Sequence, residues 1–228
     1  MAAKYVYFFG GDKTEGNAGL KNLLWDKGAN LAEMANFGIP IPPGFTISSE
    51  ACTSYLKNKR KLPSELWEEI LNNIKTLEEV AEKKLGDKEN PLLVSIRSGL
   101  KNFAPGLENV ILNLGMNEGA LVGLSKNIGD ESFVLDCYRR FLSTFGTSVL
   151  NIDREVFETL AQKKKKQVGK NSTEDFSLED SRVLVDKFKA ALKKNSQVEI
   201  PKDPLKQVRA GIAAFFDSWD SGAVRNYK

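Results

Sequence analysis

The sequence predicts an α/β (α+β) protein in which a small mixed sheet with helices is followed by a helical subdomain. Strand-like and helix-like segments alternate in the first half of the chain, whereas from about Glu118 onward apolar residues recur at helical spacing. The 228 residues are 41% hydrophobic, which is enough to bury a core. We expect a first subdomain over residues 1–116, a helical subdomain over 117–200, and a helix within 201–228 that returns to the first subdomain.

The first half is expected to begin and end with a strand. Aromatic and β-branched residues over 5–9 predict a strand that stops at Gly10 and Gly11. The apolar run 92–96 predicts a buried strand that delivers Arg97 at its end. Between these strands we expect, in order, a helix over 27–37 that stops at Gly38, a short strand over 45–47, a helix capped by Ser48, and a longer helix opened by Ser64.

The second half is expected to be helical. One core-facing stripe repeats every fourth residue, at Phe133, Cys137, Phe141, Phe145 and Val149. Segment 163–175 is predicted to be a mobile loop, with lysines 163–166 as a solvated run at a helix end. Further helices are expected to begin at Asp153, at a capping box of Ser177 and Asp180, and at Asp203-Pro204.

Charge and cysteine usage limit the expected partners and compartment. The 33 Lys and Arg residues against 30 Asp and Glu give a net charge of +3, which gives no reason to expect nucleic acid or a membrane as partner. Cys52 and Cys137 are too few for a disulfide framework and fit a reducing compartment. Residues 1–9 are too short and interrupted for a signal peptide. We expect a soluble intracellular protein, in the cytoplasm first, with an organelle or a cytoskeletal assembly left open.

The chain contains no histidine. It therefore offers no imidazole as general base, metal ligand or phosphoryl carrier, and a cysteine-histidine zinc site is excluded as well. Any catalysis would have to use carboxylates, Lys, Arg and backbone groups. We predict no catalytic residue and no metal ligand in this chain.

The first candidate site is the run Lys27-Gly28-Ala29. A lysine followed by small residues at a helix start places a cation next to backbone N–H groups, which suits phosphate oxygens. The alternative is that Lys27 is merely a solvated lysine at a helix start.

The second candidate site begins at Arg97-Ser98-Gly99 and continues through a loop. The planar guanidinium of Arg97 can bind two phosphate oxygens at once, and a Pro-Gly tip tolerates close approach of its backbone to a ligand. The alternative is an arginine paired with a carboxylate beside an ordinary turn. The loop positions of interest are Asn102, Ala104, Gly106 and Asn109.

Several segments, in order along the chain, resemble the opening of pyruvate phosphate dikinases. They are Asn22-Leu23-Leu24, Lys27-Gly28, 30–34, 38–46, Glu50-Ala51-Cys52, 91–99, Pro105-Gly106, Ile111-Leu112-Asn113-Leu114-Gly115, Tyr138-Arg139-Arg140-Phe141 and Ser218-Trp219-Asp220. The segments 50–52 and 112–115 favour the dikinase over its relative phosphoenolpyruvate synthase.

The resemblance implies a partial ATP-grasp fold, in which an adenine nucleotide lies between two subdomains. It implies that Lys27 and Arg97 approach the ATP phosphates and that the loop from Asn102 to Val110 closes over the nucleotide. A complete member of the family converts ATP, phosphate and pyruvate to AMP, pyrophosphate and phosphoenolpyruvate. A phosphohistidine on a separate domain carries the phosphoryl group to a barrel domain that contains magnesium.

The chain also departs from the family pattern. Family members are several times longer, so we expect this chain to lack the second ATP-grasp subdomain, which holds magnesium, and the phosphohistidine and pyruvate domains. The family loop usually reads Ser-Met-Pro-Gly-Met-Met-Asp-Thr, but this chain has Ala104, Asn109 and Val110 at the first methionine, aspartate and threonine positions. A glycine pair usually precedes the lysine, whereas this chain has Trp25-Asp26, and Asp26 would repel a polyphosphate.

Two functions therefore stay open, and with them the question of whether the chain is an enzyme. The first is an ATP-binding region without dikinase turnover on its own, a pseudoenzyme serving as a structural or assembly component, with exposed aromatics such as Trp25 or Phe103 as anchors. The alternative is a nucleotide-binding fragment or subunit of an active dikinase. ATP is expected to bind weakly or not at all. Magnesium is expected to bind only together with ATP and the missing subdomain. A protein partner or larger assembly is expected as well.

Overall fold

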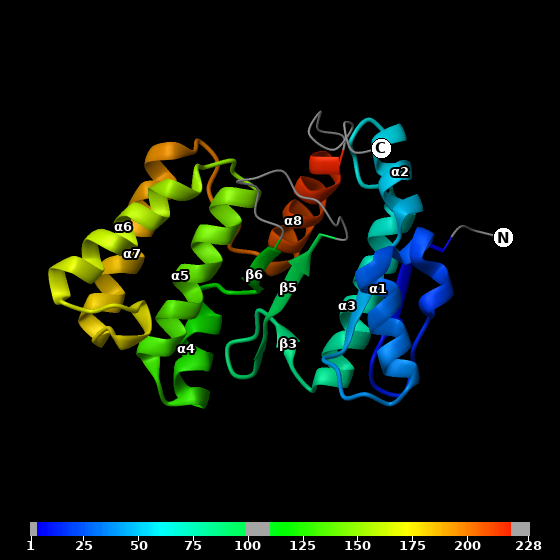
Figure 1. Cartoon of the computed structure of the whole chain (residues 1–228), viewed down its shortest axis with the longest axis horizontal. Helices are drawn as coiled ribbons and strands as arrows, with labels where there is room; N and C mark the ends of the chain where they lie inside the picture. Colours follow the sequence, from blue (N-terminus) through cyan, green and yellow to red (C-terminus); the bar gives the residue numbers. More distant parts are fainter. Residues whose placement is uncertain (1–3, 99–109, 220–228) are drawn as a thin grey trace. The chain divides into compact units, whose positions relative to one another are not determined.

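The computed structural model describes residues 4–98 and 110–219 (Figure 1). These residues divide into two units, one of 4–82 with 216–219 and the other of 83–98 with 110–215. Each unit is described by itself. The subdomain boundaries expected at 116 and 200 stay a prediction.

The first unit contains a two-stranded antiparallel sheet and three helices. Strand β1 (Val6–Phe9) pairs with β2 (Gly44–Ile47), with Val6 opposite Ile47. Val6 and Phe8 are each 1% exposed, because the alternation along β1 turns them into the core. The helices are α1 (Lys21–Asn36), which follows the short η1 (Ala18–Leu20), α2 (Ser49–Lys57) and α3 (Ser64–Ala81).

The helix signals of the first unit are confirmed. The hydroxyl of Ser48 accepts a hydrogen bond from the Ala51 N–H at 3.3 Å and so caps α2. Gly38 lies at φ 71°, in the left-handed region that ends a helix, just after α1. Helix α3 begins at Ser64, as its sequence predicts.

The strands of the second unit differ from the prediction. The run 92–96 does not form one buried strand: it is divided between β4 (Pro91–Leu92), which pairs in parallel with β3 (Lys84–Leu85), and β5 (Val94–Arg97), which pairs antiparallel with β6 (Val110–Leu114). Along β5, half-buried and exposed residues alternate, so only one face of the strand is covered. A short apolar run does not reveal by itself how many of its faces are covered.

The helices of the second unit confirm the helical second half of the chain. They are α4 (Glu118–Ile128), α5 (Glu131–Ser148), α6 (Arg154–Val168), the short η2 (Thr173–Asp175), α7 (Leu178–Asn195) and α8 (Pro204–Trp219). Helix α7 packs against both α5 and α6, and α5 also packs against β6. Residues 216–219 of α8 belong to the first unit. The predicted α/β fold is confirmed, but the described strands form three separate two-stranded sheets in place of one small mixed sheet.

The prediction of a core-facing stripe on α5 is largely confirmed. Phe141 is 1% exposed and Phe145 is fully buried, in agreement with the four-residue repeat. Phe133 is 52% exposed, so its predicted place in the core is wrong. It lies in the first turn of α5, just after the cap Asp130, where fewer neighbouring elements are available to cover it.

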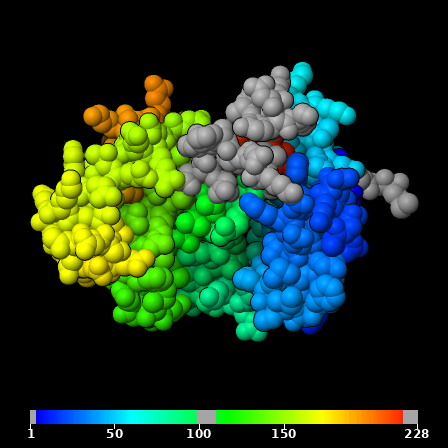
Figure 2. All heavy atoms as spheres, in the orientation of Figure 1, coloured from blue at the N-terminus to red at the C-terminus, as the bar shows by residue number. Residues whose placement is uncertain are grey.

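The mobile loop predicted over 163–175 is wrong. Helix α6 continues to Val168, and the segment after it includes η2, so most of this stretch is regular structure. Figure 2 shows the stretch in yellow-green and yellow as part of a packed surface. Lys164 is 7% exposed and forms an ion pair with Asp180 at 2.6 Å, so it is not part of a solvated run. Helical spacing places Lys164 two turns after the buried Phe157, on the same face of α6.

Among the described residues, no helix combines the length and the apolar character needed to cross a membrane.

Candidate functional site

The first candidate site lies at a break inside α1. Trp25 has φ 61° and ψ 167°, and these non-helical angles divide α1 into two helical segments. The second segment begins just after Trp25 and contains Lys27, whose side chain is exposed. A helix that restarts has backbone N–H groups in its first turn that find no acceptor within the segment. The helix start predicted at Lys27 is therefore present, although it lies inside a longer helix.

Gly28 holds this helix start against strand β2. It is buried, and a Cβ atom added to it would lie 2.6 Å from both Cγ2 and Oγ1 of Thr46. Such a distance is far below a normal van der Waals contact, so only glycine allows the helix to approach the strand this closely. The close contact between Gly28 and Thr46 thus fixes the backbone next to the exposed Lys27.

The backbone of Trp25 is strained. Its angles lie in a region that only glycine adopts readily, and a non-glycine residue there costs on the order of 1–3 kcal/mol. The indole of Trp25 packs edge-to-face against that of Trp219, with ring centroids 4.4 Å apart and an interplanar angle of 63°. Its Nε1 atom is buried and has no hydrogen-bond partner among the described residues. Trp25 is therefore not the exposed anchor that the assembly hypothesis needs.

The contact with Trp219 continues into a row of aromatic rings within the first unit. Phe216 lies 5.5 Å from Trp219 and 5.3 Å from Tyr55 of α2, measured between ring centroids. The hydroxyl of Tyr55 donates a hydrogen bond to Asp217 at 3.0 Å. The pKa of Tyr55 is raised to about 12, mainly because the hydroxyl is buried and also because of this hydrogen bond. The last turn of α8 is thus tied to α2 and to the break in α1.

Arg97 belongs to the second unit, at the end of β5. It is exposed, pairs in register with Val110 of β6, and is followed by Ser98, which is 2% exposed. Among the described residues no ion pair joins Arg97 to a carboxylate, and both interpretations of Arg97 stay predictions. Because Lys27 and Arg97 lie in different units, each is described only within its own surroundings.

The remaining predicted site residues, Asn102, Ala104, Gly106 and Asn109, lie outside the described residues, as does Phe103. Their predicted approach to a nucleotide stays a prediction.

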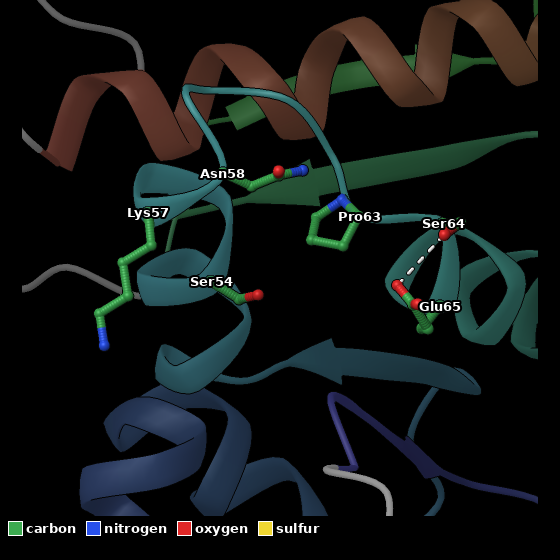
Figure 3. A pocket seen from close by; sticks show the side chains of 6 residues that line it. All are labelled: Ser54, Lys57, Asn58, Pro63, Ser64 and Glu65. Carbon is green, nitrogen blue, oxygen red and sulfur yellow. Dashed lines mark hydrogen bonds between the residues drawn. The ribbon is translucent and has the colours of Figure 1, made fainter.

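The sequence did not single out a polar hollow in the first unit. Figure 3 shows this hollow, of about 450 Å³, at the end of α2 and the start of α3. None of the predicted site residues lines it, and the Ser64 hydroxyl donates to Glu65 Oε2 at 3.2 Å within it. Its residues follow no recognisable motif, so no pattern could have revealed it. They are Ser54, Lys57, Asn58, Pro63, Ser64 and Glu65.

Within 4–98 and 110–219, no three Cys, Asp or Glu side chains come together as metal ligands would.

Comparison with known proteins shows what the stretch that contains the candidate site is similar to. Residues 22–111 match the family model of the pyruvate phosphate dikinase AMP/ATP-binding domain. This stretch includes Lys27, the break at Trp25 and Arg97. This stretch is therefore similar to a domain that binds AMP or ATP.

The relatives are pyruvate, phosphate dikinases. Over its whole length the chain is 43% identical to pyruvate, phosphate dikinase 1, chloroplastic, from Arabidopsis thaliana, of which it covers 24%. It is also 41% identical over 228 residues to pyruvate, phosphate dikinase from Clostridium symbiosum and covers 26% of that protein. The chain thus spans about a quarter of the length of these relatives, and its resemblance to their amino-terminal, nucleotide-binding region is confirmed.

Proposed function

We propose that this chain binds the phosphate groups of an adenine nucleotide at the helix start that follows Trp25, with Lys27 as the cation. The observation that carries the proposal is the break in α1, which creates a helix start next to an exposed lysine inside the stretch that matches the AMP/ATP-binding domain. A helix start attracts anions through its N–H groups and its dipole, and Lys27 adds a full positive charge.

Arg97 is proposed as the second cation of the same function. Its guanidinium suits bidentate binding of phosphate oxygens, and it is exposed at a strand end that leads into the predicted nucleotide loop. Asn102, Ala104, Gly106 and Asn109 would contribute from that loop. Mg²⁺ is proposed to enter on the phosphates of ATP, because Mg²⁺ in such sites is held largely by substrate phosphates.

The affinity is proposed to be weak, and the chain alone is proposed to carry out no dikinase turnover. It corresponds to about a quarter of its relatives, and it contains no histidine that could carry a phosphoryl group. Formation of phosphoenolpyruvate from ATP, phosphate and pyruvate by the purified chain, lost on Lys27→Ala substitution, would contradict this part of the proposal.

Calorimetric titration with Mg-ATP tests the binding. We expect saturable heat with a dissociation constant on the order of 1 mM, because only part of a complete site is present. Lys27→Ala should weaken binding by about tenfold, as the loss of one charge-assisted contact predicts, and Arg97→Ala should weaken it as well.

The matched control is Lys75→Ala, which removes an exposed lysine from α3. It should leave the affinity unchanged. Equal affinity in the Lys27 and Lys75 variants, or no heat at millimolar nucleotide in any of them, would refute binding at the helix start.

A role as an assembly component is the second candidate function. Its support is an apolar patch at the end of α1 formed by Met34, Phe37 and Ile39, which are 37%, 75% and 44% exposed. The Ile39 N–H donates to the Met34 carbonyl at 3.0 Å, which keeps the patch together. Exposed aromatic residues of this kind are typical anchors for a protein partner. For either candidate function we propose a location inside the cell, because the cysteine usage fits a reducing compartment.

Photo-crosslinking tests the assembly role. Benzoylphenylalanine in place of Phe37 should give a discrete crosslinked protein in cells, because a partner would cover this patch. The same group in place of Phe133, which is 52% exposed, is the matched control. Identical crosslinking patterns from the two positions would mean that the patch is not a specific interface.

A further inference from the structure

We propose that the contact between Trp25 and Trp219 is an autoinhibitory latch on the helix start that carries Lys27. This inference rests on the proposed function and concerns the regulation of the same site. In the latched state the indole of Trp25 is packed on Trp219. In the open state it leaves Trp219, and the backbone before Lys27 becomes accessible to phosphate.

The first argument is the backbone of Trp25. A glycine at this position could adopt φ 61° and ψ 167° without strain, but a tryptophan cannot. Strain of this kind persists only where surrounding contacts hold it in place. The described contact that can do so is the edge-to-face packing on Trp219, at 4.4 Å between centroids.

The second argument is the position of Trp25 relative to the restarted helix. The residue before a helical segment is the one whose side chain normally accepts hydrogen bonds from the first turn. The indole has only a donor, Nε1–H, and so cannot accept them. That donor is itself buried without a partner among the described residues. The latched state therefore leaves the indole N–H without the hydrogen bond that it would favour.

The third argument is the support behind Trp219. The rings of Phe216 and Tyr55 continue from it, and Asp217 accepts from the Tyr55 hydroxyl at 3.0 Å. Asp217 also forms an ion pair with Arg60 at 2.9 Å. The last turn of α8 is thus fixed on α2 and presents Trp219 as a firm surface for the indole of Trp25.

Together these contacts describe a residue that is poised between two states. Phosphate must approach the backbone of the helix start closely, and a bulky ring on the preceding residue opposes that approach. For a ligand that binds only the open state, the apparent affinity is the intrinsic affinity multiplied by the fraction of molecules in that state. If the open state is populated at 10% or less, releasing the latch raises affinity by about tenfold or more.

The test is a titration with Mg-ATP of the complete chain and three variants. Trp25→Gly removes the ring and the strain, Trp219→Ala removes the surface on which the ring packs, and Trp67→Phe is a control at a tryptophan of α3. We expect Trp25→Gly and Trp219→Ala to bind about tenfold tighter than the original chain, with Trp67→Phe unchanged. The gain should disappear when Lys27→Ala is added to Trp25→Gly.

A second readout does not depend on affinity. Two indoles in close contact give an exciton couplet in circular dichroism, which Trp67→Phe should retain and Trp219→Ala should lose. Saturating Mg-ATP should abolish the couplet of the original chain as the latch opens.

The outcomes separate the latch from the proposed function. If the original chain binds Mg-ATP but neither tryptophan variant binds more tightly, the latch is wrong and the proposed function stands. Tighter binding that survives Lys27→Ala, or a couplet unchanged at saturation, also overturns the latch. If no variant binds at millimolar nucleotide, both proposals fail.

Discussion

Replacing Gln207 with leucine is expected to lower the free energy of unfolding by about 3 kcal/mol. Gln207 on α8 is 1% exposed, and its side chain serves three backbone groups. Its Oε1 accepts from the Gly115 N–H at 2.9 Å, and its Nε2 donates to the carbonyls of Met116 at 3.0 Å and Pro201 at 2.8 Å. Leucine fills similar space but leaves these groups without partners, and each buried group left unsatisfied costs about 1–3 kcal/mol.

Urea unfolding followed by far-ultraviolet circular dichroism measures the effect. The matched control is Gln162→Leu, because Gln162 is exposed on α6, and it should change the free energy of unfolding by less than about 0.5 kcal/mol. A loss in the Gln207 variant no larger than in this control would show that the three hydrogen bonds contribute nothing to stability.

Asp136→Asn is expected to cost a similar amount, about 3 kcal/mol. The side chain of Asp136 is 8% exposed and holds two arginines: Arg139 Nε lies 2.9 Å from Oδ1, and Arg140 Nε lies 2.7 Å from Oδ2. Asparagine has nearly the same shape but no charge, so Arg139 loses the carboxylate that it pairs with, and Arg140 keeps only its ion pair with the exposed Glu174. The expected cost is at the lower end for a broken buried ion pair, because Arg140 is 43% exposed.

The effect of Asp136→Asn should depend on pH. Burial alone would raise the pKa of Asp136, but the charges and hydrogen bonds of Arg139 and Arg140 outweigh it and lower the pKa below its ordinary value of 3.8. A carboxyl with a lowered pKa stabilises the fold fully above the unfolded value, and this contribution disappears as pH falls through the folded value. The difference between variant and original chain should therefore be constant near neutral pH and shrink below pH 3.8.

The control for this measurement is Asp186→Asn, which changes an exposed aspartate on α7. Unfolding in urea at neutral pH and at acidic pH should show little change for this variant. If the two aspartate variants lose equal stability, or if the loss at Asp136 is the same at all pH values, the ion pairs are not its cause.

Local signals in the sequence predicted much of the fold. Capping side chains act on N–H groups only two or three residues away, so Ser48, Asp153 and Ser177 could be assigned as helix caps from sequence, and each of them accepts the expected hydrogen bond. The four-residue repeat of α5 likewise depends on helix geometry alone, and it identified Phe141 and Phe145 as core residues.

Features that depend on distant contacts could not be predicted. The burial of Lys164 requires Asp180 from another helix, and the division of the run 92–96 depends on which strand each half pairs with. Neither partner is indicated by the local pattern.

The candidate site likewise combines a feature that the local sequence predicts with one that depends on a distant contact. The motif around Lys27 predicted a helix start, and the structure contains one. Nothing local indicates that Trp25 adopts angles that only glycine favours, because Trp219, against which it packs, lies far away in the sequence. The position of Arg97 at a strand end was predictable from its flanking apolar run.

The distribution of tryptophan gives the first unit an optical signal of its own. All three tryptophans, Trp25, Trp67 and Trp219, belong to the first unit, whereas helices α4 to α7 belong to the second. Intrinsic tryptophan emission therefore reports on the first unit, and the helical dichroism signal comes largely from the second. Coincident urea transitions by these two probes would mean that the chain unfolds as one cooperative system, and separate midpoints would give the stability of each unit without any mutation or label.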